Sequence, residues 1–253
     1  MPAPISVQLY SLREEAEQDF PAVIARVGEI GFEGVEPAGF HGLSPHEFRR
    51  KVEAAGMVVS SAHAPLPLGA EANRILDAQQ ALGHEHFIVP FLPPERFGTR
   101  DEILRVAEEL NRAHPAVSAR GMRLGYHNHW WEFSQQIDGR SAHELLFEAL
   151  APEIFAEVDT YWARVGGRDP AQVVAELGSR ARLLHLKDGP ADGPKSAMTA
   201  VGSGTLDVPA IALANAEVAW QVVELDRCDG DMFEAIEQSY RYLTGQGLAR
   251  GRV

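Results

Sequence analysis

One unit recurs along this chain: an amphipathic helix, a glycine suited to a left-handed C-cap, and within a few residues a short apolar strand. Two such junctions are Ala54-Ala55-Gly56 before Val58-Val59 and Glu176-Leu177-Gly178 before Leu183-Leu184. Strand and helix alternate in this way from one end of the sequence to the other. Such alternation is typical of parallel α/β architectures.

Eight apolar, strand-like segments can be counted, and they cover residues 4–10, 33–37, 57–63, 86–91, 122–129, 154–159, 181–187 and 218–225. Eight βα units in 253 residues suit a closed (β/α)8 TIM barrel. A doubly wound open sheet shows the same alternation, but no glycine-rich dinucleotide fingerprint follows the first segment. We therefore expect a barrel, and because no linker interrupts the sequence we assign residues 1–253 to one domain.

Composition narrows the class of protein further. With 45% apolar and 23% charged residues the chain can bury a substantial core, and a single cysteine, Cys228, excludes an intramolecular disulfide. No secretory leader stands at the start, and no run approaches the roughly 18 apolar residues of a membrane span. A cytoplasmic protein is expected. The net charge of −13 would repel a phosphate backbone, so nucleic acid is a poor partner.

Polar side chains gather where the predicted strands end, which is the edge at which TIM barrels carry their active sites. These ends hold Glu36, His63, His127-Asn128-His129, Glu157-Val158-Asp159, His185-Leu186-Lys187-Asp188 and Glu224-Leu225-Asp226. Side chains two apart on a strand share a face. A single histidine or carboxylate at a strand end is more often a hydrogen-bonded structural residue. Four on consecutive strands would be costly to bury without a compensating cation, so together they predict a metal site.

The expected cofactor is one divalent metal ion. Imidazole nitrogens and carboxylates from separate strands form a mixed ligand set that suits Mn, Co, Zn or Fe(II), or Mg if oxygen ligands dominate.

The strand-end motifs resemble those of the xylose isomerase-like TIM barrels, the sugar phosphate isomerases and epimerases, along nearly the whole chain. The most specific marks are residues 126–133 (YHNHWWEF), 159–162 (DTYW), 185–188 (HLKD) and 202–204 (GSG) with Asp207. In relatives such as the ketose 3-epimerases, a Glu, an Asp, a His and a Glu on strands five to eight hold the metal. The resemblance therefore implies Asp159, His185 and Glu224 as ligands. His127 fills the fourth position, where this sequence departs from the family's Glu.

The resemblance also implies an activity: a metal-dependent isomerase or epimerase that moves a proton on a small sugar, sugar phosphate or keto-sugar through an enediolate. In the epimerases both metal-bound glutamates carry the proton, so the change to His127 leaves Glu224 as the matching base. His127 and Lys187 are further catalytic candidates. Glu132 could be a nearby acid or a salt-bridge partner. The candidate substrate-binding residues are His63, Glu36, His129, Trp162 and Arg227.

Other functions stay open at this point. Loss of a β-hydroxyl from the same intermediate would make the protein an inosose dehydratase-like lyase. An endonuclease IV-like DNA repair enzyme fits less well, because Trp162 and Pro90 stand where its three-metal site would need histidines. A non-catalytic sugar-binding barrel is a further alternative. The expected partner is a small carbohydrate, without nucleic acid or membrane, and a homo-oligomer is left open. Residues 188–204, the longest non-periodic stretch, are expected to order over bound substrate.

Overall fold

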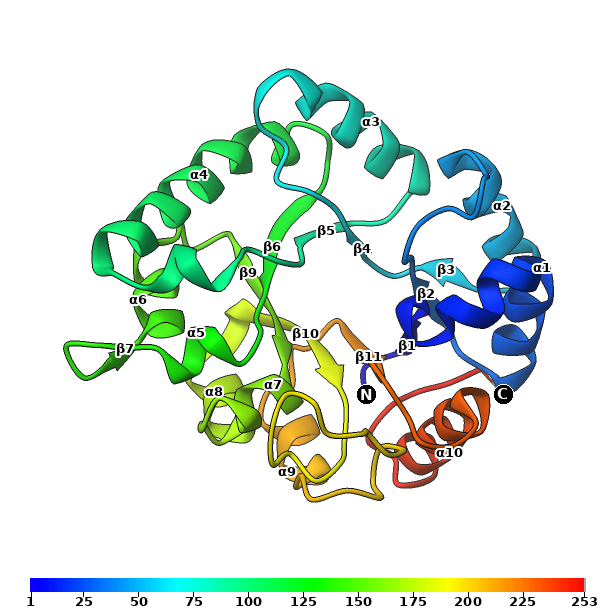
Figure 1. The fold of residues 1–253 in the computed structure, drawn as a ribbon. Coiled ribbons are helices and arrows are strands. Elements are labelled where there is room, and N and C mark those ends of the chain that lie inside the picture. The colour runs from blue at the N-terminus through cyan, green and yellow to red at the C-terminus, as the bar shows by residue number, and fades with distance from the viewer. Residues whose placement is uncertain (253) are drawn as a thin grey trace.

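The computed structural model of the protein describes residues 1–252 and shows parallel strands arranged around an axis, with helices on the outside (Figure 1). The strands follow the order β3-β2-β1-β11-β10-β9-β6-β5-β4. Their bounds are β1 Ile5–Gln8, β2 Gly34–Glu36, β3 Val58–Val59, β4 Ala62–His63, β5 His86–Val89, β6 Arg123–His127, β9 Phe155–Asp159, β10 Ala181–Leu186 and β11 Trp220–Val223. The predicted TIM barrel is confirmed.

The third predicted strand, residues 57–63, is divided into two short strands with different neighbours. β3 pairs with β2, whereas β4 pairs with β5 on the other side. Between them the Ser60 N–H still donates to the Val35 carbonyl at 3.0 Å, and just after them the Ala64 N–H donates to the Ile88 carbonyl at 2.9 Å. The segment therefore bridges both neighbours, and the nine strands fill the eight positions of a nearly closed barrel.

Helices cover the outer face of the sheet: α1 Arg13–Ile30, α2 Pro45–Ala54, α3 Ala72–Leu82, α4 Arg100–Ser118, α5 Trp131–Ser134, α6 Ala142–Ala149, α7 Thr160–Val165, α8 Pro170–Leu177, α9 Val208–Leu213 and α10 Met232–Gly245. A small hairpin, β7 Gln136–Ile137 and β8 Arg140–Ser141, follows α5. Glycines of the same kind end α1 and α3, where Gly31 and Gly83 adopt φ values of 112° and 78° that are strained for an L-residue. Within residues 1–252, a helix both long and apolar enough to cross a membrane is not found.

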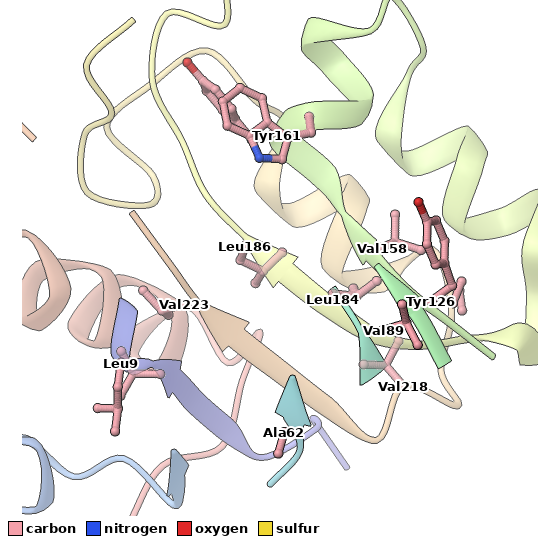
Figure 2. Close-up of a cluster of buried hydrophobic side chains, with 14 of the residues drawn as sticks. Leu9, Ala62, Val89, Tyr126, Val158, Tyr161, Leu184, Leu186, Val218 and Val223 are labelled. Carbon is pink, nitrogen blue, oxygen red and sulfur yellow. The ribbon is translucent and has the colours of Figure 1, made fainter. Parts of the chain in front are cut away.

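Alternation along each strand sends successive side chains to opposite faces of the barrel wall. Leu184 and Leu186 of β10 belong to the main buried core, and Figure 2 shows them in one apolar cluster with Val158 and Val223. His185, between the two leucines, contacts carboxylates across the barrel interior instead. The apolar face thus holds the barrel to its helices, while the inner face is free to carry polar groups.

Large apolar side chains close the N-terminal end of the barrel interior. Ile88, Phe155 and Leu183 form a buried cluster of their own, with Trp220 packed against it. Phe155 fits because its neighbour on β6 is Gly125, where an added Cβ would overlap the Phe155 ring. We call this cluster the floor, since every polar residue described below lies further along the strands.

Replacing Gly125 with alanine should destabilise the barrel by about 1–3 kcal/mol, because the new methyl group must displace a fully buried aromatic ring. Chemical denaturation followed by circular dichroism measures this. Gly245→Ala is the matched control, since Gly245 is exposed, lies at the end of α10 and has no neighbour that a Cβ would touch. Equal midpoints for the two variants would show that the floor tolerates the extra group.

Candidate metal centre at the barrel mouth

Polar side chains fill the barrel interior in two layers above the floor. The lower layer consists of Gln8, Glu36, His63 and Glu157, and the mouth layer consists of Asp159, Lys187, Glu224 and Asp226. The imidazoles of His127 and His185 lie between the layers and contact both. Apart from the partly exposed His63 and Asp226, these side chains are buried, so their charges must be satisfied mainly by one another.

Lys187 is the centre of the mouth layer. Its Nζ lies 2.9 Å from Asp159 Oδ2, 2.7 Å from Glu224 Oε2 and 2.7 Å from Asp226 Oδ2. Burial alone would lower the pKa of Lys187, but the three carboxylates outweigh it and hold the pKa well above its ordinary value. Burial likewise acts to raise the pKa of Glu224, while Lys187 and His185 hold it well below its ordinary value. The mouth therefore pairs an ammonium donor with an ionised carboxylate.

The two carboxylate oxygens of Asp159 have different surroundings. Its Oδ1 caps α7 by accepting the Trp162 N–H at 2.8 Å. Its Oδ2 accepts no hydrogen bond, although it is fully buried and Lys187 Nζ lies 2.9 Å away. Burial raises the pKa of Asp159 to about 6. The ion pair with Lys187 compensates part of the cost of burying this oxygen, and a metal ion at the mouth would compensate it further.

Each of the two imidazoles spans the layers. His185 Nδ1 lies 2.8 Å from Glu224 Oε2 at the mouth, and its Nε2 lies 2.9 Å from Glu36 Oε1 below. His127 Nε2 lies 3.6 Å from Asp159 Oδ2, and its Nδ1 lies 3.0 Å from Glu157 Oε2. Burial would lower the pKa of His185, but Glu157 and Glu36 hold it well above its ordinary value. Burial does lower the pKa of His127, to about 3.

These residues fit a divalent metal ion. Oxygens of Asp159 and Glu224 and a ring nitrogen of His185 lie within 4.8 Å of one another, and His127 turns Nε2 toward the same place. Asp159 Oδ2 accepts no hydrogen bond of good geometry, although the Lys187 ammonium lies 2.9 Å away, so it can serve as a ligand atom. Lys187 keeps Asp226 as its counter-ion if the other two carboxylates turn to a metal. The donor set of imidazole and carboxylate is one that first-row divalent ions accept.

The lower layer contains Glu157, a polar strand-end residue for which the sequence predicted no catalytic, metal-binding or substrate-binding role. Glu157 is fully buried and accepts hydrogen bonds from His63 Nε2 at 2.6 Å and His127 Nδ1 at 3.0 Å. Its pKa, which burial would raise, is held well below its ordinary value mainly by His185 and His63. Its position two residues before Asp159, on the same face of β9, was the available signal.

The predicted substrate-binding residues fall into different places. Glu36 and His63 lie in the lower layer, where His63 Nε2 is 3.1 Å from Glu36 Oε1. His129 stacks on the Trp131 ring at 4.3 Å, and the Trp162 ring lies 5.3 Å from Lys187 Nζ, so both are near the mouth. Arg227 is exposed and donates to the Pro194 carbonyl at 2.8 Å, which places its guanidinium on the long loop rather than among the clustered side chains.

Asp188 anchors the loop that follows β10. Its carboxylate accepts the backbone N–H groups of Gly202, Gly204 and Leu206 at 2.9, 3.0 and 3.2 Å. A Cβ on Gly204 would overlap this carboxylate, which explains the glycine in the sequence motif. The loop is therefore tied down at its base beside the site, and its ordering over a substrate stays a prediction.

Comparison with known proteins agrees with this geometry. The family model described as xylose isomerase-like TIM barrel matches residues 24–225. The chain belongs to this family. A sugar phosphate isomerase/epimerase from Parabacteroides distasonis shares 25% sequence identity, with coverage of 99% of this chain and 96% of that one and a TM-score of 0.83.

More distant structures share the fold of this xylose isomerase-like barrel. A probable 3-DHS dehydratase involved in petrobactin synthesis, from Bacillus anthracis, is 12% identical, with 95% and 98% of the two chains covered and a TM-score of 0.71. An L-ribulose 3-epimerase is 16% identical, with 97% and 94% covered and a TM-score of 0.66. No match is found among curated proteins. The family predicted from the strand-end motifs is thus confirmed.

Glu132 lies beside the site without touching its imidazole rings. It is fully buried, its Oε1 accepts the Tyr126 hydroxyl at 2.6 Å, and its Oε2 accepts the His129 N–H at 2.9 Å. Burial outweighs these bonds and raises the pKa of Glu132 to about 7. Folding therefore favours the neutral acid.

The stability that this neutral acid contributes should be fully present below pH 4.5, the ordinary pKa, and should be lost as the pH rises through about 7. Glu132→Gln mimics the neutral form at every pH. As the pH rises from 4.5 to 8, the free energy of unfolding of the variant should increase relative to that of wild type by on the order of 2–3 kcal/mol. Urea unfolding of both proteins across this range measures the difference, in which other titrating groups cancel. A constant difference would show that Glu132 is ionised throughout.

Proposed function

We propose that this protein is a metal-dependent isomerase or epimerase that moves a proton on a small sugar, sugar phosphate or keto-sugar. The observation that carries the proposal is the pairing at the mouth: Glu224 Oε2 lies 2.7 Å from Lys187 Nζ, beside the Asp159 and His185 atoms that fit a metal. A proton acceptor and a proton donor at one barrel mouth are what an enediolate reaction requires.

The roles of the side chains follow from their charges. A divalent ion held by His127, Asp159, His185 and Glu224 would act as a Lewis acid toward a substrate carbonyl. Glu224, kept ionised, is the base that removes the proton from the carbon beside the carbonyl. Lys187, kept protonated, donates to the substrate oxygen on which negative charge develops. His127, whose pKa is about 3, is neutral and serves as a ligand rather than a proton donor.

The charges also favour one class of substrate. The protein carries a net charge of −13, and the Lys187 ammonium is already compensated by three carboxylates. A neutral keto-sugar therefore suits the mouth better than a phosphorylated one, and nucleic acid suits it least. The relative named as a sugar phosphate isomerase/epimerase supports the reaction type, and the solved L-ribulose 3-epimerase shares the fold.

A second candidate is an inosose dehydratase-like lyase. Elimination of a β-hydroxyl needs an acid for the leaving group as well as a base, and Lys187, bonded to Asp226 at 2.7 Å, could fill that place. An isomerase and a lyase would share the first proton transfer, so the two candidate functions are distinguished by the product that forms.

Metal binding tests the proposed site directly. Wild-type protein purified gently should carry a divalent metal ion, and Asp159→Ala and His185→Ala should each lose most of it, because each removes a donor atom. Elemental analysis by mass spectrometry measures the content. Asp229→Ala, which removes an exposed carboxylate, is the control and should match wild type. Unchanged metal in both site variants would remove the basis of the proposal.

Proton transfer tests the role of Glu224. Wild-type protein is incubated with ketoses, keto-inositols and 3-keto-glycosides in deuterated water, and deuterium in recovered sugars or loss of water is followed by mass spectrometry. Glu224→Gln should slow exchange on the order of 100-fold to 10,000-fold, because it keeps one oxygen but loses the base.

His127→Gln and Lys187→Met are compared with metal content confirmed for each. If Glu224→Gln exchanges at the wild-type rate while either of these does not, the base is His127 or Lys187 instead.

A further inference from the structure

Both imidazoles proposed as metal ligands turn their second ring nitrogen toward one buried carboxylate. His127 Nδ1 lies 3.0 Å from Glu157 Oε2, and His185 Nε2 lies 3.3 Å from Glu157 Oε1. The opposite ring nitrogens, His127 Nε2 and His185 Nδ1, face Asp159 and Glu224 at the mouth. One carboxylate thus lies behind two rings and on the side away from the proposed metal.

The sheet explains how one residue reaches both rings. β9 lies between β6 and β10 in the barrel, and Glu157 is paired in register with His127 on one side. On the other side Asp159, two residues along the same face, is paired with His185. Glu157 is fully buried, and its Oε1 has no hydrogen-bond donor of good geometry even though His185 Nε2 is close.

The hydrogen-bonding capacity of a carboxylate determines which nitrogen of a facing imidazole carries the hydrogen. A neutral imidazole carries hydrogen on one nitrogen and a lone pair on the other, whereas a carboxylate can accept hydrogen bonds but not donate them. His127 Nδ1, which faces Glu157 at 3.0 Å, therefore carries the hydrogen, and the lone pair is left on His127 Nε2 at the mouth.

We propose that Glu157 is a positioning residue that fixes the ring orientation and tautomer of His127, so that His127 Nε2 presents its lone pair to the metal. This inference rests on the metal site of the proposed function.

Neighbouring groups hold Glu157 in this role. His63 Nε2, on β4, donates to its Oε2 at 2.6 Å and so holds the carboxylate in place. Glu36 is a second carboxylate at His185: its Oε1 lies 2.9 Å from His185 Nε2 and accepts a hydrogen bond from Gln8 Nε2 at 2.6 Å. His127, by contrast, has Glu157 as the carboxylate at its Nδ1. Loss of Glu157 should therefore disturb His127 more than His185.

The test compares Glu157→Gln with Glu132→Gln, an equally buried carboxylate that does not contact either ring. Co²⁺ affinity is measured by competition with a chelator, and ring tautomers are read from ¹⁵N shifts of histidine-labelled protein without metal. Glu157→Gln should bind Co²⁺ 10-fold to 100-fold more weakly and should shift the His127 ring signals, because the amide offers one acceptor in place of two. Glu132→Gln should match wild type in both. Glu157→Asp, which keeps a carboxylate, should recover part of the Co²⁺ affinity. It replaces Glu157→Gln in the test if the amide variant does not fold.

Several results would overturn the inference. Unchanged Co²⁺ affinity and ring shifts in Glu157→Gln would show that Glu157 is structural. Full binding in Asp159→Ala, with loss in His63→Ala and Glu157→Gln, would show that the metal is held instead by the group of His63, His127, Glu157 and His185. Absence of Co²⁺ binding by the wild-type protein would instead contradict the proposed function. The ¹⁵N shifts of the metal-free protein would still decide whether Glu157 orients the His127 ring.

Discussion

Mutual compensation of buried charge inside the barrel is the constraint on which the rest of this structure depends. Lys187 lies among three carboxylates, and His185 lies between Glu224 and Glu36. Removing one partner of such a buried set leaves an unpaired charge, which costs several kcal/mol. The chain can hold this many ionisable groups at its centre because each one stabilises its neighbours. The residues proposed for catalysis are therefore also residues that keep the barrel interior together.

The barrel keeps these charges apart from the apolar contacts that hold it together. Strand alternation places leucine and valine side chains against the helices and polar side chains inside, so one strand serves two purposes. Below the polar layers, Phe155 fills the space that Gly125 leaves open. This floor closes the N-terminal end of the interior, and the polar groups lie further along the strands, toward the mouth. The apolar floor and the proposed site thus occupy opposite ends of the same strands, as is general for this fold.

The arrangement proposed at the mouth is compatible with more than one reaction. The fold is shared with an epimerase and a probable dehydratase. A base, a nearby acid and a set of metal-binding atoms serve both reaction types, and the outcome depends on where the acid delivers its proton. In this chain Lys187, the proposed acid, is compensated by three carboxylates, and Glu224, the proposed base, lies 2.7 Å from it. Small differences in the groups around Lys187 could therefore redirect the reaction without changing the barrel.

Local patterns in the sequence were enough to predict the barrel and the residues at its strand ends. Helix-capping glycines and apolar periods are short-range signals, and they identified eight strand segments and the inward face that carries Asp159, His185 and Lys187. Distances across the barrel are not short-range. Whether the third segment would divide between two neighbours, whether Arg227 would reach the site, and which carboxylate would face His127 depend on how the strands tilt and close. Periodicity says which face a side chain takes, whereas the closed sheet decides what it meets there.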